Sequence, residues 1–431
     1  MVHPFTTSYH GIELMKIAII GSGISGLTCA YYLQNNHDIS LFEANDYVGG
    51  HTHTHDIDLA GKTYAIDTGF IVFNDWTYPN FIKLMDELNV SSQPSSMGFS
   101  VKCERTGIEY NGVSLNRLFA QRSNLIRPSF LRMIADILRF NKEAPLWLED
   151  GDDGTTLESY LKSHGYSQVF QDHYIIPMGA AIWSSGRANM LAFPFRYFVR
   201  FFYNHGMLTV GKRPVWRTIQ GGSKSYLKPL TQGFQHKIRL STPVDSIKRD
   251  VNGITIKPRG QEPERFDAVV LACHSDQALG LLAEPTQAEQ VILGAMRYQA
   301  NEAVLHTDVT VLPKKHLAWA AWNYHIRKQD QQLVALTYDM NILQGLDAPE
   351  TFCVTLNYAE VIDPSRIIKR MIYHHPVYSR ESIAAQKRHR DISGMNRTYY
   401  CGAYWGFGFH EDGVNSALHV VEQITRLEKH E

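Results

Sequence analysis

Two kinds of hydrophobic pattern alternate along the chain. Short, almost wholly apolar runs rich in β-branched residues are typical of strands buried in a parallel sheet. The clearest are Lys16–Ile20 and Phe266–Ala272. The same pattern predicts further strands at Ile39–Phe42, Lys237–Leu240, Val244–Lys248 and Thr398–Cys401. Helical spacing predicts helices from Leu27 to about Leu33 and from His410 to about Leu427. Strand, helix and strand in succession predict an α/β fold with a Rossmann-type unit at the amino end.

Two long stretches interrupt this pattern. The first, at 76–215, is mainly helical, with amphipathic helices predicted at Tyr78–Leu88, Pro128–Phe140 and Leu157–His164. The second, at 285–390, has β-branched and aromatic runs at Ala303–Thr310, Leu333–Tyr338 and Phe352–Tyr358, which predict a mixed sheet. We therefore expect a Rossmann-type domain made of 15–75, 216–284 and 391–431. It is interleaved with a mixed α+β substrate-binding domain made of 76–215 and 285–390.

The first strand runs directly into a glycine-rich turn, Gly21-Ser22-Gly23-Ile24-Ser25-Gly26. In a strand–turn–helix context, Gly21 permits the tight turn, Gly23 lets backbone approach a pyrophosphate, and Gly26 lets the helix pack close to the strand. The helix amino end offers N–H groups and partial positive charge to the phosphates. Glu43 ends the second strand, where a carboxylate accepts hydrogen bonds from ribose hydroxyls. The segment predicts a dinucleotide site.

The segment after the second strand distinguishes FAD from NAD. It reads Glu43-Ala44-Asn45-Asp46-Tyr47-Val48-Gly49-Gly50-His51-Thr52, and it resembles a segment of the flavin-containing amine oxidase and phytoene desaturase superfamily. The resemblance implies noncovalently bound FAD, with Gly49 and Gly50 passing beside its diphosphate. His51 and Asn45 stand where the family has arginines. Asp67-Thr68-Gly69-Phe70 resembles the family loop near the isoalloxazine.

The same resemblance extends to the carboxyl end. It implies that Val244 contacts adenine through its backbone, that Gly402 lies near the ribityl or phosphate groups, and that Gly413 and Val414 present amides to the flavin pyrimidine. Tyr404 and Trp405 stand where the family has aromatics over the flavin. Nearly the whole chain also resembles a bacterial subfamily associated with cyclopropane-fatty-acyl-phospholipid synthase-like methyltransferases. This implies lipid acyl chains as a substrate class and a lipid methyltransferase as a partner.

The choice of catalytic candidates depends partly on a lysine that this chain lacks. The family's amine oxidases carry a lysine in a substrate-domain strand, and the corresponding stretch here, Gln299–His306, has none. His306, Glu302, His410 and Glu411 are candidate proton carriers instead, with Tyr404 and Trp405 at the flavin. His51, His53 and His55 alternate, as metal ligands on a strand would. No acidic or cysteine partner accompanies these histidines, so we do not expect them to bind a metal. We expect His51 to lie near the phosphates of FAD and His53 to lie near the flavin ring.

Composition narrows the function classes. The 431 residues carry a formal charge of −1, with 44% hydrophobic and 20% charged residues, so nothing favours a nucleic-acid partner. The five cysteines form no disulfide framework, and Met1–Leu14 lacks the apolar core of a secretory signal. We expect a cytoplasmic protein. Phe193–Tyr203 interleaves Arg196 and Arg200 with aromatics, which favours core packing or, alternatively, a peripheral membrane surface.

Our leading hypothesis is an FAD-dependent oxidoreductase that takes a hydride from a hydrophobic substrate such as a lipid acyl chain. Three alternatives stay open at this point: an amine oxidase, a non-redox flavin-dependent isomerase or mutase, and a non-catalytic partner of a lipid methyltransferase. A non-redox isomerase needs a basic diphosphate pocket, for which the arginines of the helical stretch are candidates: Arg187, Arg196, Arg200 and Arg213.

Overall fold

The computed structural model describes residues 14–149, 154–209, 211, 213–329 and 333–427. The chain folds into two compact units, each built from separated segments. The first comprises 1–50, 227–294 and 385–431, and the second comprises 51–226 and 295–384. The two sets therefore interleave along the sequence, as expected from the hydrophobic pattern.

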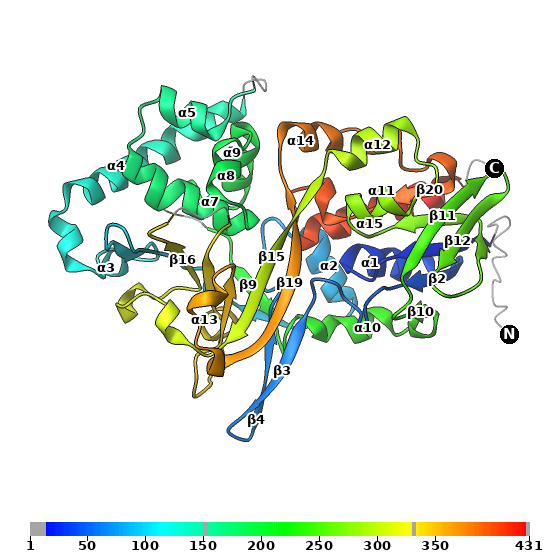
Figure 1. Ribbon diagram of the computed structural model, residues 1–431, viewed down its shortest axis with the longest axis horizontal. Coiled ribbons are helices and arrows are strands. Elements are labelled where there is room, and N and C mark those ends of the chain that lie inside the picture. Colours follow the sequence, from blue (N-terminus) through cyan, green and yellow to red (C-terminus); the bar gives the residue numbers. More distant parts are fainter. Residues whose placement is uncertain (1–13, 150–153, 210, 212, 330–332, 428–431) are drawn as a thin grey trace, which may run out of the picture. The chain divides into compact units, whose positions relative to one another are not determined.

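A parallel five-stranded sheet forms the centre of the first unit, in the order β10-β2-β1-β14-β20 (Figure 1). Its strands are β1 (Lys16–Ile20), β2 (Asp38–Phe42), β10 (Ile238–Arg239), β14 (Ala268–Leu271) and β20 (Thr398–Tyr400). The predicted Rossmann-type sheet is thereby confirmed. β10 is shorter than its apolar run because it pairs with β2 only at its two residues.

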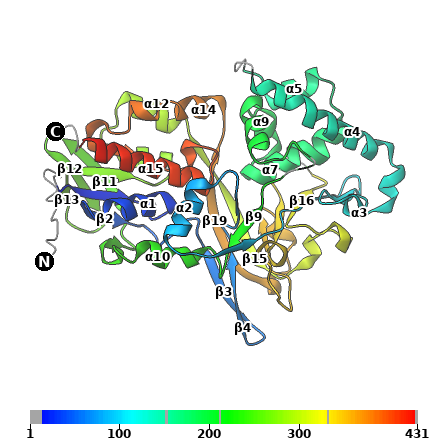
Figure 2. The same ribbon diagram turned by 180° about the vertical axis from the view of Figure 1, so that it is seen from behind.

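Helices alternate with the strands of this unit along the chain. They are α1 (Ile24–Leu33), α10 (Leu227–Thr231), α11 (Ser275–Leu281), α12 (Gln287–Gly294) and α15 (His410–Leu427). α1 and α15 pack side by side (Figure 2). A separate antiparallel sheet contains β11 (Val244–Asp250), β12 (Gly253–Pro258) and β13 (Glu264–Phe266).

The second unit contains a seven-stranded sheet, in the order β19-β15-β18-β17-β16-β7-β8. The strands in that order are β19 (Ile367–Val377), β15 (Arg297–His306), β18 (Cys353–Leu356), β17 (Leu336–Asp339), β16 (Trp322–Ile326), β7 (Phe99–Cys103) and β8 (Glu109–Asn111). The pattern predicted a mixed sheet but missed β7 and β8. β7 is set by parallel pairing with β16, more than two hundred residues along the chain, and β8 then pairs with β7 as a neighbouring antiparallel strand.

Smaller sheets complete the strands of the second unit. β3 (Thr54–Leu59) and β4 (Lys62–Asp67) form a hairpin. β9 (Trp216–Ile219) pairs with β5 (Phe73–Asn74) and β6 (Ser92–Pro94). These pairings, and the bond from the Asp67 amide to the Gln344 side chain (3.0 Å), place 51–75 and 216–226 in the second unit.

Aromatic side chains form the core of the helical part of the second unit. Its helices are α2 (Pro79–Glu87), α3 (Leu115–Leu118), α4 (Pro128–Glu143), α5 (Leu157–Ser163), α6 (Gln168–Phe170), α7 (Ile176–Trp183), α8 (Arg187–Leu191) and α9 (Phe195–Asn204), and α13 (Met340–Gln344) follows β17. α14 (Arg380–Gln386) crosses the division between the units. The rings of Tyr160 and Phe195 stack with centroids 3.7 Å apart.

The aromatic stretch predicted as core or membrane surface is mostly core. Phe195, Phe198 and Phe202 on α9 are buried. Arg196 and Arg200 both donate to the Leu148 carbonyl, at 2.7 and 3.3 Å. The aromatic face therefore stabilises the fold rather than lying open. No helix among the described residues is long and apolar enough to cross a membrane.

Candidate flavin site

The glycine-rich turn connects β1 to α1 and has the open geometry that a ligand phosphate needs. Gly21 has φ +105°, and a side chain there would lie 2.9 Å from the Ala272 carbonyl oxygen. A Cβ on Gly26 would lie 2.0 Å from the Gly21 oxygen, so only glycine lets α1 approach the strand this closely. At Gly23, by contrast, a Cβ would meet nothing within 4 Å. The turn is thus packed on the protein side and open at Gly23.

The amino end of α1 adds favourable electrostatics to this turn. Gly23 is the N-cap and forms no side-chain cap, while Ile24 and Ser25 begin the helix. Helix amino ends carry N–H groups and partial positive charge that favour phosphate. The paired glycines lie against this end: the Gly49 amide donates to the Ser22 carbonyl at 3.0 Å. A Cβ on Gly50 would lie 3.2 Å from the α-carbon of Gly23, so both backbones meet here.

Glu43 lies where the ribose contact was predicted. Its side chain is buried at the end of β2. Oε2 accepts from the Ser22 amide (2.9 Å) and the Ser22 hydroxyl (2.6 Å), and Oε1 accepts from the Asn45 amide (2.8 Å). A carboxylate has about four acceptor positions, so Oε1 keeps one for a hydroxyl. Ala44 beside it is exposed. The Thr242 amide donates to the Glu43 carbonyl (2.8 Å), which brings the chain leading into Val244 beside β2.

The carboxyl-terminal segment meets the same edge of the parallel sheet. Gly402 follows β20, and its amide donates to the Ser416 hydroxyl (2.9 Å), which donates to the Gly413 carbonyl (2.9 Å). A Cβ on Gly413 would lie 2.8 Å from the Ile24 side chain. The amino ends of α15 and α1 therefore converge. Gly413 and Val414, predicted from sequence to bind the cofactor, lie beside the glycine-rich turn.

Tyr404 and Trp405 lie in the turn after Gly402. The Tyr404 ring covers Gly402, where a Cβ would be 2.4 Å from the ring, and Tyr404 is buried. The Trp405 indole packs on the His389 ring with centroids 4.4 Å apart. Its Nε1 is buried and has no hydrogen-bond partner among the described residues. A buried donor without an acceptor is costly, so a bound group that accepts from Trp405 fits this place.

Asp412 is a residue that the motif analysis did not select. It is partly buried in the first turn of α15, and it follows His410 and Glu411, which are buried. Its Oδ2 accepts from the Phe409 amide at 2.9 Å. Burial raises the pKa of Asp412 to about 7. The spacing of an acid three residues after the residue that caps a helix is a recognisable capping signal, but its burial is visible only in the structure.

In the second unit, the chain continues from the paired glycines into a close backbone crossing. The Phe70 amide donates to the His51 carbonyl at 2.7 Å, and a Cβ on Gly69 would lie 2.2 Å from that oxygen. The Thr52 hydroxyl is bonded to the Tyr226 hydroxyl. Burial and the neighbouring His374 lower the pKa of His51 to about 4. His51 is therefore neutral at pH 7 and replaces the family's arginine without its charge.

The hydrogen bonds around His53 define its tautomer. The Thr68 hydroxyl lies 3.0 Å from the His53 carbonyl, which can only accept, and 2.7 Å from the Tyr373 hydroxyl. Since Thr68 has one proton and gives it to the carbonyl, Tyr373 must donate to Thr68. His53 Nδ1, 2.8 Å from the Tyr373 hydroxyl, then carries the proton and donates to Tyr373. Of the two neutral tautomers, only the one with the proton on Nδ1 satisfies all three contacts.

Two further sequence expectations concern histidines. His306 is fully buried in β15: its Nε2 contacts the Thr355 hydroxyl (2.7 Å), and its Nδ1 accepts from the Asp308 amide (3.0 Å). Burial lowers its pKa to about 4. The catalytic assignment of His306 is therefore wrong, because neither ring nitrogen is available to a substrate. Glu302 on the same strand pairs with Arg370 at 2.7 Å. Among the described residues, no group of three or more His, Cys, Asp or Glu is placed to hold a metal.

Comparison with known proteins shows the family. The model of flavin-containing amine oxidoreductases matches residues 24–341. The chain belongs to that family. Members contain a flavin, and the open turn at Gly23, the free acceptor position of Glu43 and the unpartnered Trp405 indole fit one. By family membership the chain is a flavin-containing oxidoreductase.

Individual relatives are similar over different lengths. A 1-hydroxycarotenoid 3,4-desaturase from a Flavobacterium species is 37% identical over 98 residues, which cover 22% of this chain and 18% of the desaturase. The match therefore spans less than a fifth of that relative. Cyclohexylamine oxidase from Brevibacterium oxydans superposes with a TM-score of 0.69 at 14% identity, covering 97% of this chain and 100% of that one. A conjugated-linoleic-acid-producing fatty acid isomerase from P. acnes gives 0.66 at 15% identity, covering 98% and 99%. The flavoprotein thus shares its fold with enzymes of different reactions.

Proposed function

We propose that this flavoprotein dehydrogenates a hydrophobic substrate, such as a lipid acyl chain, at a C–H bond, with His53 accepting the accompanying proton. When bound, FAD supplies a hydride acceptor at N5. The observation that carries the proposal is the His53–Tyr373–Thr68 chain of hydrogen bonds. It holds the imidazole in one orientation with Nδ1 as a donor, and an oriented histidine is a common proton carrier in catalysis.

Strand β15 supports a substrate other than an amine. The strand contains no lysine, and polar groups on it are hydrogen-bonded to other parts of the protein. Asn301 Nδ2 lies 3.0 Å from His375 Nδ1, and Gln299 donates to the Ser184 carbonyl at 3.0 Å. The residue type used by the family's amine oxidases is therefore absent from this strand. The likeness to a carotenoid desaturase points in the same direction.

Other residues have supporting roles in the proposal. Gly23, Glu43 and the amino ends of α1 and α15 would hold FAD noncovalently. Tyr373 keeps the His53 ring oriented. His410 and Glu411, in the first turn of α15, are the alternative proton carriers. A lipid methyltransferase partner remains part of the proposal on the sequence likeness alone, and a peripheral membrane location on the arginine and aromatic pattern of Phe193–Tyr203 alone.

Anaerobic reduction of the bound flavin tests the proposal. Decanoate and oleate are mixed with the holoenzyme, with cyclohexylamine and putrescine as amine comparators, and loss of the oxidised-flavin absorbance is followed. We expect acyl compounds to bleach the flavin and amines to leave it oxidised. Bleaching by an amine alone would establish the amine oxidase alternative. Isomerisation that needs prior dithionite reduction, with no net electron transfer, would establish the isomerase.

The role of His53 is tested with matched variants. His53→Gln is expected to slow reduction about 100-fold or more while the bound flavin content stays constant. Tyr373→Phe should slow it less, since the imidazole is kept but its orientation is lost. His236 is exposed in the first unit, and His236→Gln serves as the control with an unchanged rate. Equal rates in His53→Gln and the control would remove His53 from the mechanism.

A further inference from the structure

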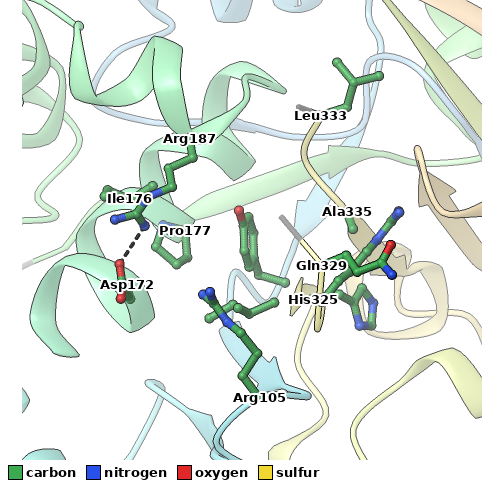
Figure 3. A pocket seen from close by; sticks show the side chains of 12 residues that line it. Arg105, Asp172, Ile176, Pro177, Arg187, His325, Gln329, Leu333 and Ala335 are labelled. Carbon is green, nitrogen blue, oxygen red and sulfur yellow. Dashed lines mark ion pairs between the residues drawn. The ribbon is translucent and has the colours of Figure 1, made fainter. Parts of the chain in front are cut away.

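A small cavity in the second unit is lined by residues that the proposed function does not use. Its volume is about 50 Å³. Since one water needs about 10–15 Å³ of such space, the cavity accommodates a group of three or four heavy atoms. Figure 3 shows its lining, which comes from α7, α8, β16, the segments that flank them and the turn between β7 and β8. The size matches a planar head group such as a carboxylate.

The charged lining of this cavity is predominantly positive. Three arginines line it, Arg105, Arg187 and Arg327, with one carboxylate, Asp172. Arg187 and Asp172 form an ion pair at 2.6 Å, drawn as a dashed line in Figure 3. His325, also in the lining, has its pKa lowered to about 3 by burial and the nearby cations Lys102 and Arg327, so it is neutral. The lining therefore carries more positive than negative charge.

Arg327 is the residue that most directly indicates a ligand. It is 8% exposed, and its guanidinium stacks on the Tyr358 ring at 3.8 Å. Nη1 donates to Glu360 at 2.8 Å and Nη2 donates to the Asn357 carbonyl. Nε is buried and has no acceptor among the described residues. A buried guanidinium with an unsatisfied donor, lining a cavity, is a site for an oxyanion.

An irregular helix places Asp172 in this lining. Residues Gln171–Ile175 form a π-helical turn directly before α7. Pro177 has no N–H to donate to the His173 carbonyl four residues earlier, and that carbonyl accepts from the Tyr110 hydroxyl instead, at 2.6 Å. Wide turns of this kind are frequent at functional sites. Here the turn positions a single acid that pairs with Arg187 and partly offsets the arginines.

The remaining lining is apolar except for the Gln329 amide. Its apolar members are Ile176, Pro177, Ile326, Leu333 and Ala335, with Tyr324 beside them. A free inorganic anion gains nothing from contact with these apolar side chains, whereas an acid on a hydrocarbon chain contacts both the arginines and the apolar side chains. The combination selects an amphipathic acid.

We propose that this cavity binds the carboxylate of an acid carried on an apolar chain, with Arg105 and Arg327 as its cationic partners and the aliphatic side chains against its first carbons. The proposal concerns binding and does not depend on the flavin reaction. If the acid is also the compound oxidised, this deepens the proposed function by naming its head group.

Calorimetric titration of the holoenzyme tests the proposal with octanoate as the probe. Acetate, inorganic phosphate and 1-octanol are titrated alongside. We expect one octanoate site per chain and weaker binding of the other three by at least about tenfold, because each lacks the charge or the chain. If acetate or phosphate bound with the same affinity as octanoate, the proposed role of the apolar side chains would be overturned. Octanol equal to octanoate would overturn the role of the arginines.

Variants locate the site. Arg327→Gln is expected to raise the octanoate Kd about tenfold or more, and Arg105→Gln, at an exposed side chain, should raise it about fivefold. Asp172→Asn frees Arg187 from its counter-ion, and about threefold tighter binding is expected. Arg122→Gln, at an exposed arginine outside the cavity, is the control.

The outcomes separate binding from catalysis. Unchanged octanoate binding in both Arg105→Gln and Asp172→Asn would overturn the proposal even if Arg327→Gln failed to fold. Octanoate that binds with these variant effects but never bleaches the flavin leaves the site standing and counts against acyl oxidation. Flavin bleaching by acyl compounds with unchanged Kd across the variants supports the function and refutes this site.

Discussion

The open position at Gly23 provides a direct test of where the cofactor diphosphate binds. Gly23 has φ −68° and ψ 176°, which any residue adopts, and a Cβ there meets nothing within 4 Å. Gly23→Ala therefore adds a methyl group that the apoprotein accommodates. In Gly26→Ala, three residues along, the new Cβ would lie 2.0 Å from the Gly21 carbonyl oxygen. The two substitutions are chemically identical and differ only in what surrounds them.

Gly23→Ala is expected to change the affinity for FAD, whereas Gly26→Ala is expected to change the stability of the apoprotein. Alanine at Gly23 restricts the unfolded chain, so the apoprotein should be unchanged or more stable by about 0.4–1 kcal/mol. If the diphosphate passes over Gly23, the methyl occupies its space. Overpacking of about 1–3 kcal/mol corresponds to a Kd for FAD raised about 5- to 150-fold. Gly26→Ala forces α1 away from β1, and we expect the apoprotein itself to lose at least about 2 kcal/mol.

Two measurements on deflavinated protein separate these effects. The free energy of unfolding is taken from urea titration, and FAD affinity from quenching of FAD fluorescence on binding. Gly23→Ala should show native stability with weakened FAD binding, whereas Gly26→Ala should lose both. Wild-type FAD affinity in Gly23→Ala would refute the assignment of the diphosphate to this turn. Lowered stability in Gly23→Ala would refute the claim that the position is open.

Three other predictions follow from single side chains. Burial raises the pKa of Asp412 to about 7 from 3.8, which means that the folded protein favours the protonated carboxyl. This contribution to the free energy of unfolding is fully present below pH 3.8 and is lost as the pH rises through 7. Asp412→Asn should gain on the wild type over that range, by up to about 4 kcal/mol in urea titrations, and a pH-independent difference would contradict the shift. Glu289→Gln should destabilise by about 3 kcal/mol in chemical denaturation, since Arg249, 10% exposed and 2.5 Å away, loses its counter-ion; a neutral result would show the pair to be unimportant. Tyr373→Phe should replace the single Nδ1–H tautomer of His53 by a mixture in ¹⁵N spectra of histidine-labelled protein, and an Nε2–H signal in the wild type would contradict the assigned tautomer.

Local features were accessible from the sequence because neighbouring residues produce them. The strand Lys16–Ile20, the glycine-rich turn and the helix after it follow from periodicity and from backbone geometry that only glycine allows. Glu43 could be placed at the end of a strand for the same reason. The resemblance at the paired glycines, Gly49 and Gly50, indicated that the bound dinucleotide is FAD, and the match to the family confirms a flavin cofactor.

Other properties of the candidate residues were visible only in the tertiary structure. They depend on burial and on contacts between segments that are distant in sequence. His306 was an open candidate until the sheet enclosed it between Thr355 and Asp308. His53 acquired a defined tautomer only from Tyr373, which lies 320 residues away in sequence. The unsatisfied nitrogen of Arg327 likewise exists only because the surrounding chain excludes water from it. Residue type and spacing determine which chemistry is available, whereas solvent exclusion and long-range hydrogen bonds determine which groups can perform it.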